Sequence, residues 1–137
     1  MWTEAMDAVD TALGIQPDYP PALFKRSQLW YREGEYDLAI QDLNRYIELR
    51  PLSSQGYYYR ANAYDEVGKY DDALRDFDMA ISISPDYAHA HNNRVVTLAK
   101  MGCFEEAQEG IDNALRIVED CFRLHLTRIF IYQSMGE

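Results

Sequence analysis

The residues whose types could support catalysis or metal binding are few, and their spacing forms no active set. The histidines are His89, His91 and His125, and the first two are separated by a single residue, so on a helix they point to different sides. Zinc ligands must converge on one point, so this pair does not predict a metal site. Cys103 and Cys121 lack C-x-x-C spacing, so we expect two free thiols, ahead of a disulfide or a metal pair.

Two acidic pairs are the remaining candidates for acid–base chemistry. Asp71–Asp72 and Glu105–Glu106 each follow an aromatic residue that opens a helical pattern. Carboxylates at a helix start favour the positive end of the helix dipole, so we expect solvated helix starts rather than catalytic pairs. The sequence also has no glycine-rich phosphate loop. We therefore predict that the chain is not an enzyme and needs no cofactor or metal.

A regular series of arginines suggests a structural use of charge. Four arginines recur at one fixed interval, and an aspartate follows each of the first two at a second fixed interval: Arg26, Arg60, Arg94 and Arg128, with Asp42 and Asp76. An unpaired charge on a packing face is costly, so we expect Arg26 and Arg60 to form ion pairs with Asp42 and Asp76. The alternative is that the arginines point outward and hold a ligand. Gly110 takes the third aspartate's place, so Arg94 needs another partner.

The 34-residue spacing of the arginines extends over the whole chain. GEYDLAIQDLNRYIELRP at 34–51 is nearly repeated by GKYDDALRDFDMAISISP at 68–85. The same period relates four glycines, four alanines, three prolines and four aromatic residues: Gly34, Gly68, Gly102, Gly136; Ala5, Ala39, Ala73, Ala107; Pro17, Pro51, Pro85; Trp2, Tyr36, Tyr70, Phe104. A fixed period of this length is typical of a stacked-repeat protein.

Each repeat contains two helical segments. Apolar residues in 36–49 and 70–81 recur at i, i+3, i+4 and i+7, and a helical segment of about 14 residues precedes each of them. The glycine between the segments suits a helix C-cap, and the closing proline ends the second helix. One helical hairpin cannot bury its own apolar face, so the units must stack. The sequence predicts an all-α fold, an α-solenoid of helix-turn-helix units.

This pattern resembles the tetratricopeptide repeat (TPR) family. The matching residues are Gly34, Tyr36, Ala39, Leu43 and Pro51; Gly68, Tyr70, Ala73, Phe77, Ala80 and Pro85; and Gly102, Phe104, Ala107, Ile111 and Ala114; together with the first-helix aromatics Trp30 and Tyr64. The third unit departs from the pattern, with Leu98 in an aromatic place and Glu119 in the proline's place. The resemblance implies a right-handed superhelix whose first helices line a concave groove and whose second helices form the convex back.

The repeat register divides the chain into one array over 1–137. We expect a second-helix half unit at 2–19, full units at 20–53, 54–87 and 88–121, and a first-helix half unit at 122–137. The sequence is therefore interpreted as a segment of a longer array. Its first and last helices lack a capping neighbour, which leaves open a head-to-tail association, an isologous dimer or a monomer.

The charge distribution bears on the partner. The net charge of −10 argues against nucleic acid. The first-helix windows 20–34, 54–68, 88–102 and 122–136 nevertheless hold eight basic and three acidic residues, so the groove side is biased toward positive charge. We therefore expect an extended peptide or protein partner, acidic or carboxylate-bearing rather than basic. No apolar run is long enough to predict membrane insertion.

Helix spacing and the family's usual groove positions together predict the residues that line the groove. They are Lys25, Gln28, Arg32, Tyr58, Tyr59, Asn62, His89, Asn92, Asn93, Lys100, Arg123 and Thr127. Some family members clamp a C-terminal carboxylate with two asparagines and three basic residues. Asn62, Asn93 and Arg123 match three of those places, but Tyr58 and Thr127 stand where basic residues belong. The incomplete set argues against chaperone-tail binding of that kind.

We interpret the chain as a non-catalytic scaffold that binds a peptide or protein in its groove. The alternatives are a self-assembly module that associates through its terminal helices, or a segment that positions a substrate for a larger enzyme. The compartment stays open, and the absence of a secretory signal at the start of this sequence slightly favours an intracellular one.

Overall fold

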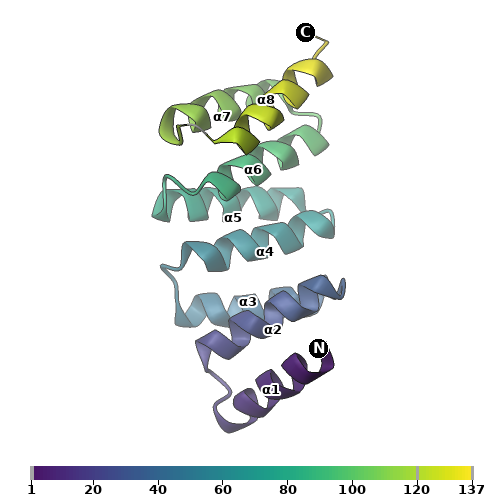
Figure 1. Cartoon of the computed structure of the whole chain (residues 1–137), viewed down its shortest axis with the longest axis vertical. Coiled ribbons are helices and arrows are strands. Elements are labelled where there is room, and N and C mark those ends of the chain that lie inside the picture. The colour runs from purple at the N-terminus through teal and green to yellow at the C-terminus, as the bar shows by residue number, and fades with distance from the viewer. Residues whose placement is uncertain (1, 120, 137) are drawn as a thin grey trace.

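The computed structural model describes residues 2–119 and 121–136, and these residues form α-helices without any strand. The helices are α1 (Trp2–Ile15), α2 (Pro20–Arg32), α3 (Tyr36–Leu49), α4 (Ser54–Glu66), α5 (Tyr70–Ile83), α6 (Ala88–Lys100), α7 (Phe104–Ile117) and α8 (Phe122–Ser134). They stack in chain order from α1 at one end to α8 at the other (Figure 1). The predicted all-α solenoid is confirmed. None of the described helices has both the length and the apolar character needed to cross a membrane.

Glycine makes the turn between the two helices of each unit. Gly34, Gly68 and Gly102 have φ values of 80°, 81° and 79°, a left-handed conformation that other residues adopt at a cost. After α2, the Gly34 N–H donates to Tyr31 O at 3.0 Å, and the Glu35 N–H donates to Trp30 O at 2.9 Å. These bonds satisfy carbonyl groups at the end of α2, so the predicted C-cap role of the glycines is confirmed.

The third unit keeps the register although its closing residue differs. The helix α5 ends at Ile83 and α7 ends at the equivalent Ile117, with Glu119 where Pro51 and Pro85 stand in the earlier units. The backbone N–H of Val118 donates to Ala114 O at 2.8 Å, as Ser84 does to Ala80 O at 2.9 Å. The proline is therefore not needed to end this helix.

The apolar core is distributed along the stack as three clusters. One lies mainly on α1 and α2, one on α4 to α6, and one on α6 to α8. Ala39, Ala73 and Ala107, three of the periodic alanines, are completely buried. Phe77 is the largest fully buried side chain and lies in the middle cluster. Each cluster joins neighbouring helices only, as expected for a repeat protein.

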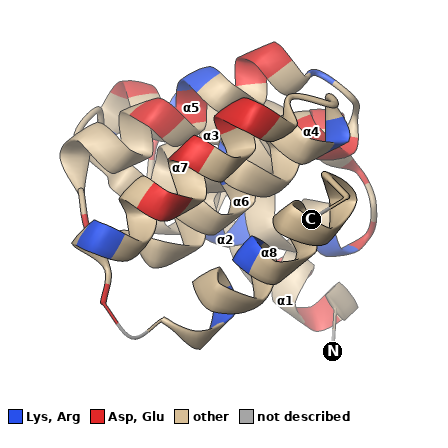
Figure 2. Ribbon diagram, turned by 90° about the horizontal axis from the view of Figure 1, so that it is seen from above, with Lys and Arg blue, Asp and Glu red and all other residues tan. Residues whose placement is uncertain are grey.

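The first helices of successive units lie close to one another and define the inner side of the stack. α4 packs against α6 and α6 against α8, and hydrogen bonds from Asn93 to Asn62 and from Thr127 to Asn92 join them. Seen along the stack, acidic segments gather over α3, α5 and α7 (Figure 2). The inner side therefore belongs to α2, α4, α6 and α8.

The last helix is apolar on two faces that differ in burial. Leu124 and Ile131 are completely buried against α6 and α7, whereas four large apolar side chains of α8 are exposed: Phe122, Leu126, Ile129 and Phe130. The end of the stack that α8 forms therefore presents an apolar surface.

Candidate functional site

The periodic arginines lie between first and second helices and are used structurally. Arg26 donates from Nε and Nη2 to the two carboxylate oxygens of Asp42, both at 2.7 Å. Arg60 binds Asp76 in the same bidentate way, at 2.7 and 2.8 Å. Both carboxylates are buried, and the hydrogen bonds to Asp42 and Asp76 raise the pKa of the two guanidinium groups above the ordinary arginine value.

A second row of partners precedes the arginines along the chain. Arg26 Nη1 contacts Asp10 at 3.2 Å, Arg60 Nη1 donates to Asn44 at 2.9 Å, and Arg94 Nε donates to Asp78 at 2.6 Å. Arg128 Nε lies 3.2 Å from Asp112. Sequence reasoning missed this row, although its members recur with the same period as the arginines: Asp10, Asn44, Asp78 and Asp112. Arg94, which faces Gly110 on α7, thus obtains its partner from α5.

The inner side carries a hydrogen-bonded network centred on Asn93. Its amide nitrogen donates to Asn62 Oδ1 at 2.9 Å and to the hydroxyl of Tyr58 at 3.1 Å. Its oxygen accepts from Asn92 at 3.2 Å, and Asn92 in turn accepts from Thr127 at 2.5 Å. Three first helices, α4, α6 and α8, are thereby joined by polar side chains.

An acidic cluster adjoins this network. Asp65 accepts hydrogen bonds from Thr97 at 2.7 Å and from Lys100 at 2.5 Å, and the bond to Asp65 raises the pKa of Lys100. Glu66 accepts from the Tyr31 hydroxyl at 3.3 Å. Burial, and after it the nearby Glu66 charge, raises the pKa of Tyr31 well above its ordinary value. This stretch of the inner side is therefore not basic, because Asp65 balances the positive charge of Lys100 and Glu66 adds a further carboxylate.

Three hollows share lining side chains on the inner side of the stack, and we refer to them together as the groove. A pocket of about 160 Å³ lies between α2 and α4, a central pocket of about 370 Å³ between α4 and α6, and a third of about 620 Å³ near the starts of α4 and α6. We call them the α2–α4 pocket, the central pocket and the tyrosine pocket. Tyr31 lines the first two, Tyr58 the last two, and Tyr59 the first and third.

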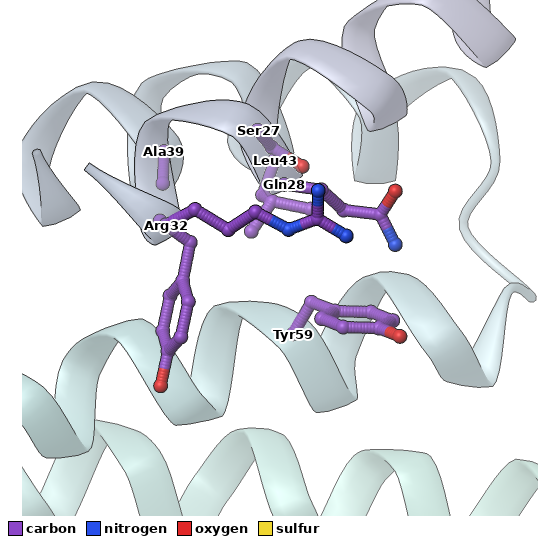
Figure 3. Close-up of a pocket in the computed structure, with 7 residues that line it drawn as sticks. Ser27, Gln28, Arg32, Ala39, Leu43 and Tyr59 are labelled. Carbon is purple, nitrogen blue, oxygen red and sulfur yellow. The ribbon is translucent and has the colours of Figure 1, made fainter. Parts of the chain in front are cut away.

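The α2–α4 pocket has apolar walls and a polar rim. Ala39 and Leu43 of α3 lie at its base, and Tyr31 and Tyr59 line it from α2 and α4. Figure 3 shows the side chain of Arg32 extended along the pocket toward Gln28, with Tyr59 on the other wall. Ser27 also lines the pocket, but its hydroxyl is already bonded to Phe24 O at 2.6 Å.

The tyrosine pocket is walled by a run of aromatic contacts. Tyr58 packs on Tyr87 with ring centroids 4.9 Å apart and on Tyr59 at 5.2 Å, and Tyr59 contacts Phe24 at 5.2 Å. Burial raises the pKa of Tyr87 above its ordinary value. These contacts hold the rings in place, so the walls of the groove are formed before any ligand arrives.

The predicted groove residues fall into three groups. Seven line the pockets: Gln28, Arg32, Tyr58, Tyr59, Asn62, His89 and Asn93, and so does the paired Lys100. Asn92 is only 5% exposed, and it links Asn93 to Thr127 instead of lining a hollow. Lys25 and Arg123 are exposed and line none of the three pockets.

The acidic members of the groove were missed from the sequence. Arg32, Glu66 and Lys100 occupy the same position of successive repeats, so the register that selected the two cations also marked this carboxylate. Asp65 shares the register of Tyr31, another lining residue that was not selected. The repeat register therefore marked both carboxylates as groove residues, but a count of the total charge on the first helices did not show where each charge lies.

The histidines and cysteines form no metal-binding arrangement among the described residues. His91 is buried, and its Nε2 lies 2.7 Å from Pro85 O, whereas His89 is exposed at the tyrosine pocket. No group of three or more His, Cys, Asp or Glu residues within 2–119 and 121–136 is placed to hold a metal ion. Cys103 and Cys121 are both free thiols.

Comparisons with known proteins identify the fold. Two family profiles described as tetratricopeptide repeat match residues 2–54 and 54–87. No curated protein matches the chain in sequence. Among solved structures, MamA superposes with a TM-score of 0.88 at 21% identity, over 98% of this chain and 79% of that one. TTC0263, a TPR protein of Thermus thermophilus, gives 0.79 at 23% identity, over 98% and 75%.

A third structure is similar over a shorter stretch. The second TPR domain of human RPAP3, solved in complex with the HSP70 peptide SGPTIEEVD, gives a TM-score of 0.73 at 23% identity, over 83% of this chain and 98% of that one. The profiles end at residue 87, yet α6, α7 and α8 continue the same packing and the same repeat register. The chain belongs to the tetratricopeptide repeat family.

Proposed function

We propose that the chain is a non-catalytic scaffold that binds an extended, acidic or carboxylate-bearing peptide of a partner protein along the inner groove. The observation that carries the proposal is the polar network at the groove's centre. It holds hydrogen-bond donors in fixed positions beside hollows that a peptide's side chains could fill. The peptide-bound TPR domain of RPAP3 supports this class of partner by analogy of fold.

The two asparagines Asn93 and Asn62 have different proposed roles in the network. Asn93 uses its amide N–H groups on Asn62 and Tyr58, so it orients these two residues. Within the described chain, the amide nitrogen of Asn62 and the hydroxyl hydrogen of Tyr58 have no acceptor. An extended peptide has carbonyl groups free to accept from them. Asn62 and Tyr58 are therefore the proposed ligand contacts, and Asn93 is their positioning residue.

Three first-helix cations support an anionic ligand. Lys25, Arg32 and Arg123 make no ion pair within the part of the chain that the structure describes, unlike the four periodic arginines and Lys100. Because Asp65 and Glu66 occupy the centre, the peptide's negative charge belongs near the ends of the groove. Binding should weaken as salt rises, since exposed charges are screened.

The arrangement differs from the family's carboxylate clamp. Asn62, Asn93 and Arg123 occupy clamp places, but Tyr58 and Thr127 replace two cations and are hydrogen-bonded to asparagines. A carboxylate at this position would meet two hydroxyl groups in place of two positive charges.

Replacing Asn62 by alanine should reduce the retention of random decapeptides on immobilised protein by roughly three- to tenfold, the worth of one neutral hydrogen bond. Asn93→Ala should cause a similar loss, because it releases both Asn62 and Tyr58. Affinity selection followed by mass spectrometry measures the retained peptides. Asn113→Ala, an exposed asparagine on α7, is the matched control. Equal retention by all three variants and the wild type would reject a groove that binds through this network.

The exposed face of α8 favours a second candidate function, self-association. Phe122, Leu126, Ile129 and Phe130 expose between 50% and 75% of their surfaces on one helix. Contiguous apolar surface of this kind is typical of a contact with another chain. We propose that a second copy of this chain covers this apolar face of α8.

Light scattering over rising protein concentration tests self-association. Wild-type protein should increase in mean mass, and Phe130→Glu should keep it monomeric, because a carboxylate cannot be buried unpaired at the contact. Leu52→Glu, which changes an exposed apolar residue in the loop before α4, should associate like the wild type. A wild type that stays monomeric throughout the range excludes this function.

A further inference from the structure

We infer that the α2–α4 pocket binds the C-terminal residue of the peptide, with its apolar side chain in the pocket and its terminal carboxylate on Arg32. This inference rests on the proposed function and adds the part of the ligand that the groove selects. It places the carboxylate on the α2 side of the groove, away from the positions of the family's clamp.

The pocket is shaped for an apolar side chain. Ala39 and Leu43 at its base are 0% and 2% exposed as residues, so the partly exposed rings of Tyr31 and Tyr59 supply the apolar surface that a ligand can reach. Its volume of about 160 Å³ is close to that of an engineered cavity that binds benzene, about 150 Å³. A leucine or phenylalanine side chain is of this size.

The walls of the pocket are held in place before binding. The ring of Tyr31 packs edge-on against Tyr36, with centroids 5.2 Å apart, and its hydroxyl donates to Glu66. The ring of Tyr59 packs edge-on against Phe24 at the same separation. Little side-chain freedom therefore remains to be lost when a ligand enters.

The polar groups on the rim remain unused. Arg32 and Gln28 make no side-chain hydrogen bond or ion pair within the described residues. A guanidinium group presents several N–H donors to a carboxylate, and the Gln28 amide can add another. Glu66 lies on the central side of Tyr31, so an anion is favoured at Arg32 and disfavoured farther along the groove.

A terminal residue satisfies both requirements with one Cα. Its carboxylate and its side chain leave the same atom, so both reach the pocket together. In an extended internal segment, an adjacent acidic side chain would point to the opposite face, and the next side chain on the same face would lie roughly 7 Å farther along the peptide. A C-terminal leucine or phenylalanine is therefore the expected occupant.

Affinity selection with two synthetic mixtures tests the inference. Both contain random decapeptides ending in leucine, one with a free C-terminal carboxylate and one amidated. Wild-type protein should retain the free-acid mixture roughly 10- to 100-fold more, the worth of a hydrogen bond to a charged group. Arg32→Gln should bring the ratio close to one. Lys69→Gln removes the same charge from an exposed residue at the start of α5, which lines none of the three pockets, and should preserve the ratio.

Further arms separate this inference from the proposed function. A free-acid mixture ending in alanine should be retained less than the leucine mixture, because alanine leaves the pocket unfilled. If retention depends on Asn62 but the free-acid and amidated mixtures are retained alike, the groove function stands and the terminal site is wrong. An amidated mixture with an internal Leu-Asp pair that is held through Arg32 would also overturn the terminal assignment. If no mixture is retained, both proposals fall.

Discussion

Replacing Phe77 by alanine should lower the free energy of unfolding by about 4 kcal/mol, the typical loss for a buried phenylalanine. Phe77 is 0% exposed and packs with Ala61, Ala73 and Ala90, whose small side chains cannot move in to fill the cavity. The loss combines the lost burial of the ring with the cavity that remains. Urea denaturation followed by circular dichroism in the far ultraviolet measures it.

A substitution of an exposed residue on the same helix shows how much of the loss at Phe77 is due to its burial. Met79 is 45% exposed, so Met79→Ala should cost less than about 1 kcal/mol. Phe77→Leu should lose less than Phe77→Ala because it leaves a smaller cavity. If Phe77→Ala and Met79→Ala were equally stable, the assignment of Phe77 to the core would be wrong.

Phe77 also lines the central pocket, next to Tyr58 and Asn93. The ring centroids of Phe77 and Tyr58 lie 6.2 Å apart. A truncated Phe77 should therefore weaken the support of Tyr58 as well as the fold, and ligand retention is best compared using Phe77→Leu.

Asp76→Ala should destabilise the protein by about 3 kcal/mol and lower Tm by roughly 10 °C. Asp76 is 6% exposed and forms two charge-assisted hydrogen bonds with Arg60. Its removal leaves a partly buried guanidinium between the rings of Tyr57 and Tyr64, with Asn44 as its one remaining hydrogen-bond partner among the described residues. The cost arises from the unpaired charge more than from the lost attraction.

The ion pair of Arg94 with Asp78 supplies the control. Its distance is 2.6 Å, but Asp78 is 58% exposed at its side chain, so Asp78→Ala should cost less than about 1 kcal/mol. The double variant Arg60→Met with Asp76→Ala should lose less than the two single variants together, because neither charge is then left unpaired. Equal melting temperatures for Asp76→Ala and Asp78→Ala would show that burial of the carboxylate does not matter here.

The sequence by itself determined the architecture. The repeat register placed the helices to within two residues at their ends and assigned the turn glycines. These features follow from interactions along one helix or across one hairpin, where the order of residues sets the geometry. The fixed offset from Arg26 to Asp42 belongs to the same class, because both residues lie in one hairpin.

The tertiary structure alone decided which polar groups remain free. Lys100 is paired with Asp65, and Thr127 with Asn92, at a chain separation of 35 in both cases, whereas Asn93 reaches Asn62 across 31. These contacts cross from one unit to the next and depend on how far each hairpin rotates and slides against its neighbour. The period of the sequence does not encode that offset. The same reason explains why Arg32 is left free at the rim of an apolar pocket.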